Sequence, residues 1–320
     1  MRIGIIGPGL LGREFYKQSQ EEGWELDFAA SRTGIYKDID KREGHGNQDL
    51  NAYSPDLVAL TIPTFDDGRM AFKYTLSFVS RGIPVVTAEK GSLANFREEL
   101  DPHLQKIGYT ATVGGGSRLL RHLRKRSPQN VKRIDAILNG TLNYIMHGLA
   151  QKRSLNELAH ECKENGYAEP GSEDTLSILN QESVGDIPMK TAILGNDSSL
   201  FPTTLRAKDF TPKKITTTDL ERLREEADQR RFIVSIARLG DNHEDRIAGF
   251  EYIAEGWRIS AGFVPLNKKE RGEFLDISGI SNALMIVGAD NCMFYVAGDG
   301  AGAKRTVETM VSDARGLLSL

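Results

Sequence analysis

The chain of 320 residues has few of the side chains that build disulfide frameworks or metal centres. It has only two cysteines, Cys162 and Cys292, and their surroundings suggest neither a redox pair nor a metal knuckle. Such sparse cysteine usage fits a reducing cytoplasm best. The six histidines are scattered along the chain. We therefore predict no dedicated metal site.

Long apolar runs and a large excess of one charge are also lacking. No run approaches the roughly 18 apolar residues of a membrane-spanning helix. The first residues, "RIGIIG", are typical of a strand and not of a signal peptide. The net charge of −3 gives no general attraction to nucleic acid or to an anionic membrane. We expect a small-molecule ligand captured by local groups, and neither a nucleic-acid nor a membrane partner.

The length and the 39% of hydrophobic residues are sufficient for about two domains. In the first part of the chain, apolar strands alternate with helices. Strands are predicted over 2–7, 25–31, 56–64 and 83–89, and helices over 10–22 and 67–81. Nearly continuous apolar strands separated by helices indicate a parallel sheet covered on both faces. The prediction is an α/β, Rossmann-type doubly wound domain over residues 1–130, whose polar stretch 33–51 is a loop with a short helix.

From about residue 131 the strands become longer and hairpin-like. They are predicted over 230–240, 246–257 and 282–298. Two helices between them start at expected capping boxes, Ser154…Glu157 and Thr218…Glu221. This pattern predicts an α+β domain over 131–298 with an open, mostly antiparallel sheet. A last helix is expected within 299–320.

The segment "GPGLLG" places Gly7, Gly9 and Gly12 in G-x-G-x-x-G spacing, after a strand and at the start of a helix. The first glycine permits a tight turn, the second lets a pyrophosphate approach the backbone, and the third allows close packing of helix and strand. Because glycine makes up a tenth of the chain, a purely structural turn is the alternative. The context favours dinucleotide binding.

The end of the second strand bears on which dinucleotide is bound. An acidic residue there would bind the ribose 2′-hydroxyl of NAD, but the chain has Ser31 and Arg32, and Asp27 lies too early. A guanidinium can pair with a 2′-phosphate. NADP is therefore favoured, NAD stays open, and a solvated Arg32 is the alternative reading.

Three charged residues are candidates for chemistry. Lys90 follows a strand at the edge where open α/β sheets bind ligands, although an ordinary surface lysine is the alternative. Asp186 and Lys190 are spaced i, i+4, so on a helix they share one face; the alternative is a surface ion pair. Their place before an apolar helix favours a cleft.

Seven segments, in this order, make the chain resemble the homoserine dehydrogenase family. They are "VVTAEKGSLA", "TVGGGSRLL", "ILNGTLNYI", "GYAE", "DIPMKTAIL", "ISGISNALMI" and "GDGAGAKRTVETMVSDA". The resemblance extends from Gly7 to Asp313. It implies a Rossmann domain, a catalytic and dimerisation domain, and a C-terminal helix that returns to the Rossmann domain. It also implies a homodimer and a place in threonine and methionine biosynthesis. Because the chain ends at Leu320, we expect no regulatory ACT domain.

The resemblance also implies a reaction and a set of site residues. The reaction is reversible hydride transfer between NAD(P)H and aspartate 4-semialdehyde, giving L-homoserine. The catalytic residues are Lys190, Lys90 and Asp186. The substrate residues are Glu169, Asp186, Lys190, Gly140, Thr141 and Asn139. The cofactor residues, including those of the glycine motif, are Gly7, Gly9, Leu10, Leu11, Gly12, Ser31, Arg32, Thr61, Pro63, Lys90, Gly300 and Gly302.

The chain departs from the family pattern in four places. Glu89 replaces the usual asparagine before Lys90, and Ser117-Arg118 replaces an apolar-Pro pair. Thr110 stands where relatives carry a glutamate that helps bind a monovalent cation, which puts that cation site in doubt. The loop 170–185 is about six residues longer than expected.

These departures keep two alternatives open. The altered loop and Arg118 fit a dehydrogenase of the same fold that acts on a related amino or hydroxy aldehyde. Glu89 fits an NADP-binding sensor that has lost catalysis.

The stretch "AILNGTLNYIM", 136–146, gives conflicting signals. Asn139-Gly140 between apolar runs is typical of a hairpin, whereas the resemblance implies strand, tight turn and helix. In that reading Thr141 lies at or near the N-cap, and Asn139 and Asn143 orient backbone or ligand. We expect this stretch to mark the active site.

Overall fold

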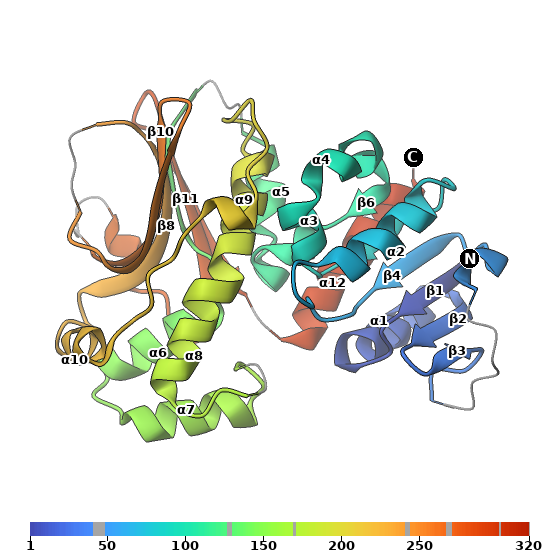
Figure 1. Ribbon diagram of the computed structural model, residues 1–320, viewed down its shortest axis with the longest axis horizontal. Coiled ribbons are helices and arrows are strands. Elements are labelled where there is room, and N and C mark those ends of the chain that lie inside the picture. Colours follow the sequence, from blue (N-terminus) through green and yellow to red (C-terminus); the bar gives the residue numbers. More distant parts are fainter. Residues whose placement is uncertain are drawn as a thin grey trace. The chain divides into compact units, whose positions relative to one another are not determined.

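The computed structural model describes residues 1–40, 49–126, 130–168, 171–240, 244–266, 271–300 and 302–319 (Figure 1). The chain forms two compact units. Unit 1 is Met1–Arg118 with Gly302–Leu320, and unit 2 is Leu119–Ala301. The first boundary lies at Arg118, before the predicted residue 130, because α5 (Leu119–Arg124) packs against α9 (Ile187–Asp197) and β11 (Ser281–Gly288) of unit 2.

Unit 1 contains a six-stranded sheet of the predicted Rossmann type, in the order β3-β2-β1-β4-β5-β6. Its strands are β1 (Arg2–Ile6), β2 (Glu25–Ser31), β3 (Gly34–Tyr36), β4 (Leu57–Leu60), β5 (Val85–Thr87) and β6 (Ile107–Gly108). All neighbours are parallel except β2 and β3. Because β1 lies between β2 and β4, the strand order reverses there, and ligands of such sheets bind at the carboxyl ends of these strands.

Two strands of unit 1 were not predicted. The strand β3 lies in the stretch taken as a loop; of that stretch, residues 41–48 lie outside the described residues. The strand β6 has only two residues. Both are too short to show a period in the sequence, and each is defined by pairing with a neighbouring strand.

Helices cover the sheet of unit 1. They are α1 (Leu10–Glu21), α2 (Arg69–Val79), α3 (Gly91–Asn95), α4 (Arg97–Leu100) and the C-terminal α12 (Ala303–Leu318). Short 3-10 segments are Leu50–Ala52, Asp101–Lys106, Thr110–Thr112 and Gly115–Ser117. Helix α12, red in Figure 1, packs against α1, β5 and β6 and buries Val307, Met310 and Val311 in the same core as Ile3 and Ile5. The end of the chain thus completes the core that its first strand begins.

Unit 2 contains an antiparallel sheet in the order β12-β11-β7-β8-β10-β9, as the sequence predicted. Its other strands are β7 (Val131–Ile137), β8 (Arg230–Arg238), β9 (Ile247–Ala254), β10 (Trp257–Pro265) and β12 (Met293–Asp299). Its further helices are α6 (Gly140–Ala150), α7 (Leu155–Glu164), α8 (Thr175–Gln181) and α10 (Thr217–Glu225), with 3-10 turns at Ala207–Asp209 and Gly272–Phe274. A π-helical turn, Glu182–Asp186, joins α8 to α9.

One of the two predicted helix starts is correct. The Ser154 hydroxyl caps α7 and accepts a hydrogen bond from Glu157 N at 3.2 Å. The cap of α10 is Thr216 and not Thr218, because the Asp219 carboxylate closes a capping box with it. Thr216 and Thr218 each have an acidic residue three positions on, Asp219 and Glu221, so the sequence pattern fits both starts and the structure shows the first.

The sheet of unit 2 contains a buried ion network around Asp135 on β7, which is fully buried. Arg271 donates from Nε and Nη2 to its two carboxylate oxygens, both at 2.9 Å. Arg133 Nε lies 2.8 Å from Oδ2. Since a buried charge is tolerated only when it is paired, this carboxylate and Arg271 depend on each other.

Candidate active site

The glycine motif of unit 1 forms a closed turn between β1 and α1. Gly7 has φ +96°, and its carbonyl accepts a hydrogen bond from Thr61 Oγ1 at 2.7 Å. A Cβ on Gly12 would lie 2.4 Å from that same carbonyl oxygen, so no other residue fits there. A Cβ on Gly9, the N-cap of α1, would meet nothing within 4 Å. The backbone at Gly9 therefore faces open space beside a helix N-terminus, which is the geometry that a pyrophosphate requires.

The other predicted cofactor residues of unit 1 lie at the start of α1, after β4 and at the end of β2. Leu10 is 78% exposed and Leu11 half-buried at the start of α1. Pro63 is exposed after β4. At the end of β2, Ser31 and Arg32 are exposed, and the Arg32 guanidinium lies 5.6 Å from the ring centroid of Phe65. The aromatic contact places the guanidinium beside the loop that follows β4, at the carboxyl edge of the sheet.

Lys90 lies in the turn between β5 and α3 and is the N-cap of that helix. It is half-buried, and its backbone N–H donates to Thr64 Oγ1 at 3.4 Å. The structure thus places Lys90 at the carboxyl edge of the parallel sheet, and its main chain is held by a residue that follows β4.

In unit 2, Lys190 and Asp186 form a close ion pair near the start of α9. Lys190 Nζ lies 2.7 Å from Asp186 Oδ2 and donates to the carbonyl of Leu138 at 2.8 Å. Their side chains are 14% and 12% exposed. This pair is not a solvated surface contact, because it is shielded and connected to the backbone at the end of β7.

Glu182, which was not among the predicted site residues, completes this cluster. Asn139 Nδ2 donates both to Glu182 Oε2 and to Asp186 Oδ2, the latter at 2.9 Å. Glu182 is buried at the start of the π-helical turn, a kind of turn that often marks functional sites. Glu182, Asp186 and Lys190 recur every four residues, and this spacing was the available signal. The cluster therefore holds two carboxylates, one ammonium and one amide.

The stretch 136–146 forms strand, turn and helix, so the hairpin reading is wrong and the resemblance reading is confirmed. The N-cap, however, is Asn139, whose Oδ1 accepts from Leu142 N at 2.8 Å. The Thr141 hydroxyl instead donates to the carbonyl of Tyr167 at 2.8 Å. Asn139 therefore has two roles. Its side-chain oxygen caps the helix by accepting from Leu142 N, and its amide nitrogen donates to the two carboxylates.

Glycine is required at the start of this helix. A Cβ on Gly140 would lie 2.3 Å from the carbonyl oxygen of Ile280. Asn143, one turn further, donates to the carbonyls of Ile277 and Gly279 at 3.2 and 3.0 Å. The turn is thus packed directly against the segment before β11, and Asn143 orients backbone as expected.

Three predicted site residues remain: Gly300, Gly302 and Glu169. A Cβ on Gly300 would lie 2.2 Å from the side chain of Asn282, so Gly300 packs against that residue. Gly302 has φ +102° and is the N-cap of α12. Glu169 lies outside the described residues.

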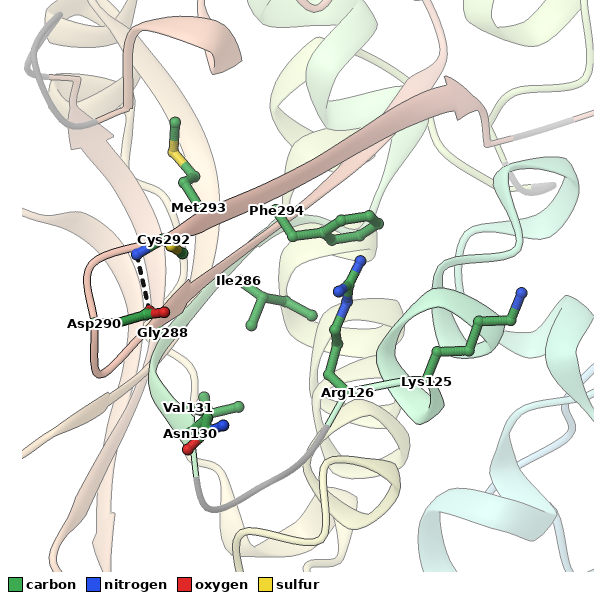
Figure 2. A pocket seen from close by; sticks show the side chains of 10 residues that line it. All are labelled: Lys125, Arg126, Asn130, Val131, Ile286, Gly288, Asp290, Cys292, Met293 and Phe294. Atoms are coloured by element: carbon green, nitrogen blue, oxygen red, sulfur yellow. Dashed lines mark hydrogen bonds between the residues drawn. The ribbon is translucent and has the colours of Figure 1, made fainter.

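A surface pocket of about 360 Å³ lies elsewhere, at the start of β7 (Figure 2). Lys125, Arg126, Asn130, Val131, Ile286, Gly288, Asp290, Cys292, Met293 and Phe294 line it. The Arg126 guanidinium lies 3.9 Å from the ring centroid of Phe294. Val131 and Ile137 are the two ends of β7, so the pocket and the Lys190 cluster are separated by roughly 20 Å of strand. This pocket is not the candidate active site.

The two thiols should differ sharply in reactivity. Burial, followed by the nearby carboxylates of Glu182 and Glu161, raises the pKa of Cys162 to about 12. A hydrogen bond with Asp290, and then its negative charge, raises the pKa of the exposed Cys292 above its ordinary value. Since the thiolate is the reacting species, we expect one thiol to react with a disulfide reagent in native protein, at a rate that rises with pH, and both to react in denaturant.

Two variants check this expectation. Asp290→Asn should speed the native reaction near neutral pH, because it removes the charge that opposes the thiolate. Cys292→Ser should abolish it. Rapid labelling of Cys162 in the folded protein would contradict the described burial.

The described residues hold no group of three or more histidine, cysteine, aspartate or glutamate side chains that could bind a metal ion. Within the same part of the chain, no helix is long and apolar enough to cross a membrane.

One unit is of Rossmann type with an open glycine turn. The other has an antiparallel sheet and a shielded lysine–carboxylate cluster. This is the architecture of the two-unit class of dinucleotide-dependent oxidoreductases. Residues 119–314 match the family model described as homoserine dehydrogenase. The chain belongs to the homoserine dehydrogenase family.

Individual relatives agree with this assignment. The bifunctional aspartokinase/homoserine dehydrogenase 1 of Zea mays is 28% identical over 243 residues, covering 62% of this chain and 25% of the relative. The chain thus spans about a quarter of the length of that relative. The solved homoserine dehydrogenase of Thermoplasma acidophilum shares the fold, with a TM-score of 0.76, 21% identity and coverage of 100% and 99% of the two chains. A hyperthermophilic archaeal homoserine dehydrogenase, solved in complex with NADPH, has a TM-score of 0.69, 20% identity and coverage of 99% and 97%.

Proposed function

We propose that this chain is an NADP-dependent homoserine dehydrogenase, which interconverts aspartate 4-semialdehyde and L-homoserine. The observation that carries the proposal is the Lys190 cluster. Its ammonium is shielded, paired with Asp186 at 2.7 Å and bonded to the Leu138 carbonyl at 2.8 Å, in a chain that belongs to the homoserine dehydrogenase family.

The residues of unit 1 fit a nicotinamide dinucleotide. The turn at Gly7 is closed by Thr61, Gly9 leaves open space, and α1 begins there with main-chain N–H groups. When bound, the cofactor supplies or accepts the hydride. The contribution of the chain is to orient the reactants and to manage one proton.

We assign that proton to Lys190. An ammonium group next to a carbonyl can donate a proton as the alkoxide forms, and in the reverse direction the amine accepts it. Asp186 and the Leu138 carbonyl hold the Nζ atom from two sides. Such fixed geometry keeps the transferring group in one place, which is the main requirement for an efficient acid–base residue.

The carboxylates of the cluster suit an amino-acid substrate. Glu182 and Asp186 both accept from Asn139 Nδ2, so the two acidic groups converge on one point. A substrate ammonium would find acceptors and negative charge there. We therefore add Glu182 to the expected substrate residues Asp186, Asn139 and Glu169.

The test is a spectrophotometric assay. Purified protein with aspartate semialdehyde should oxidise NADPH, and with L-homoserine it should reduce NADP at alkaline pH. NADH is run in parallel. Absence of any substrate-dependent change in absorbance at 340 nm with either cofactor would refute the proposal.

A dehydrogenase of the same fold on a related amino or hydroxy aldehyde is the second candidate. It is favoured by two departures from the family pattern, the longer loop 170–185 and the Ser117-Arg118 pair. A panel of aldehydes and alcohols distinguishes the two candidates. A specificity constant at least tenfold higher for another substrate would select the second.

Arg32 should determine the preference for NADP. Hydrogen bonds between charged groups are worth about 1.5–3 kcal/mol, so Arg32→Glu should weaken NADPH binding by about 10- to 100-fold and leave NADH binding nearly unchanged. Fluorescence titration measures both. Lys17→Glu, an equal charge change on the exposed face of α1, serves as the control. Equal losses for the two cofactors would show that Arg32 does not contact the 2′-phosphate.

We further propose a homodimer in a reducing compartment, acting in threonine and methionine biosynthesis. The edge strand β12 supports association, because Met293 is 51% exposed and Phe294 to Val296 are only half-buried. Both cysteines are free, which suits a reducing compartment. Sedimentation equilibrium at micromolar concentration tests the oligomeric state, and a monomer would refute the dimer.

A further inference from the structure

A carboxylate is buried in the turn that carries Lys90. Glu89 is 3% exposed. Its Oε1 accepts hydrogen bonds from Thr64 Oγ1 at 2.7 Å and from Gly91 N at 2.6 Å, and its Oε2 accepts from Ser92 N at 3.0 Å. Three donors therefore converge on one side chain, which offsets the cost of removing a charge from water.

These bonds connect two loops of the sheet. Thr64 follows β4, whereas Gly91 and Ser92 begin α3 after β5. A second hydroxyl extends the network, because Thr87 Oγ1 donates to the Leu60 carbonyl at 3.0 Å and accepts from Glu89 N at 2.9 Å. The ends of β4 and β5 are thus fixed relative to each other by side chains as well as by strand pairing.

Lys90 is the residue held by this network. Its own N–H donates to Thr64 Oγ1 at 3.4 Å. Of the neighbouring N–H groups, that of Glu89 donates to Thr87 Oγ1 and that of Gly91 donates to the Glu89 carboxylate. Close packing restricts the turn further: a Cβ on Gly91 would lie 2.7 Å from the Cα of Gly68, at the start of α2. The turn that carries Lys90 is therefore packed closely against the start of α2.

We propose that Glu89 is the positioning residue for Lys90. The role of Lys90 rests on the proposed function; the placement by Glu89 rests on the contacts above. Glutamate suits this turn better than asparagine, because its longer side chain reaches Ser92 N and both of its oxygens accept. The carboxylate beside Lys90 is thus a support for the site, and it gives no reason to regard the chain as a sensor without catalysis.

The first test is a double-mutant cycle. Glu89→Gln puts an NH2 group where an acceptor is needed, and a displacement of about 1 Å costs about 10²-fold in rate. We expect kcat to fall by that factor. Because Lys90 is also an expected cofactor residue, the NADPH dissociation constant should rise by no more than Lys90→Met raises it. In a Lys90→Met background, Glu89→Gln should have no further effect. Glu99→Gln, on the exposed face of α4, is the matched control.

Two outcomes of the cycle would overturn the proposal. Equal losses in both backgrounds would show that Glu89 does not act through Lys90. A kcat like that of wild type would show that its hydrogen bonds are not needed. If Glu89→Gln does not fold, Thr64→Val removes one donor to Glu89 together with the hydroxyl that accepts from Lys90 N, and it should lower kcat in the same direction.

The second test does not depend on activity. Hydrogen exchange of the Gly91 and Ser92 amides should be about tenfold or more faster in Glu89→Gln, and unchanged in Glu99→Gln. The rate at which an acylating reagent modifies Lys90, followed by mass spectrometry, should also change. Unchanged exchange and labelling would refute the positioning role, whether or not the wild type turns over homoserine. Absence of turnover in the wild type would refute only the proposed function.

Discussion

Replacing Lys190 by methionine should lower kcat by about 10²- to 10⁴-fold, the range expected when a positioned acid–base group is lost. Methionine is only one atom shorter than lysine but has no ionisable group, so it can neither donate nor accept the proton. It also leaves Asp186 and the Leu138 carbonyl without the ammonium that contacts both. Steady-state kinetics in both directions measure the effect, and fluorescence titration should show NADPH binding within about twofold of wild type, since the glycine turn belongs to unit 1.

Lys208→Met is the matched control for this substitution, because Lys208 is an exposed lysine of the same unit. It should leave kcat unchanged. If Lys190→Met retained the wild-type rate, the proton would have to be managed by another group, and the role assigned to the cluster would be wrong.

Replacing Asp135 by asparagine should lower the free energy of unfolding by about 3–5 kcal/mol, the cost of removing one partner from a buried ion pair. Asparagine has nearly the same volume, so the effect comes from charge. It removes the negative charge beside the Arg271 guanidinium, which is 6% exposed, and replaces one of the two oxygens that Arg271 contacts at 2.9 Å with an NH2 group that cannot accept. Urea unfolding followed by circular dichroism measures the change.

Two further variants serve as comparisons for Asp135→Asn. Asp101→Asn breaks an ion pair with Arg97 in which Asp101 is 49% exposed, and should cost at most about 1 kcal/mol. The double variant Asp135→Leu with Arg271→Met removes this pair but leaves Arg133 and Glu244, which also contact it, and should therefore recover only part of the lost stability. A small effect of Asp135→Asn would show that water or another group replaces the carboxylate.

Much of the architecture could be predicted because it depends on local periodicity. Continuous apolar strands, the spacing of Gly7, Gly9 and Gly12, and the longer hairpin strands after residue 131 each point to one kind of sheet. The shorter elements could not be predicted. The strands β3 and β6 exist through pairing, and the choice of Thr216 over Thr218 depends on which hydroxyl Asp219 reaches.

The candidate site, too, could be predicted only in part. The i, i+4 spacing of Asp186 and Lys190 was sufficient to place both on one helical face. Spacing could not show that the helix widens into a π-helical turn at Glu182, or that Asn139 from another element donates to both carboxylates. Those contacts join residues more than forty positions apart in sequence, and no local pattern reports them.

By itself the sequence determined the class of each sheet, the glycine turn and the identity of the lysine–carboxylate pair, because these features require particular residues at short separations. The tertiary structure decided what surrounds them. It placed Glu182 in the cluster, made Asn139 the cap in place of Thr141, and turned Glu89 toward the donors of two loops. The reason is physical: burial and hydrogen-bond partners are set by chain segments that meet only after folding.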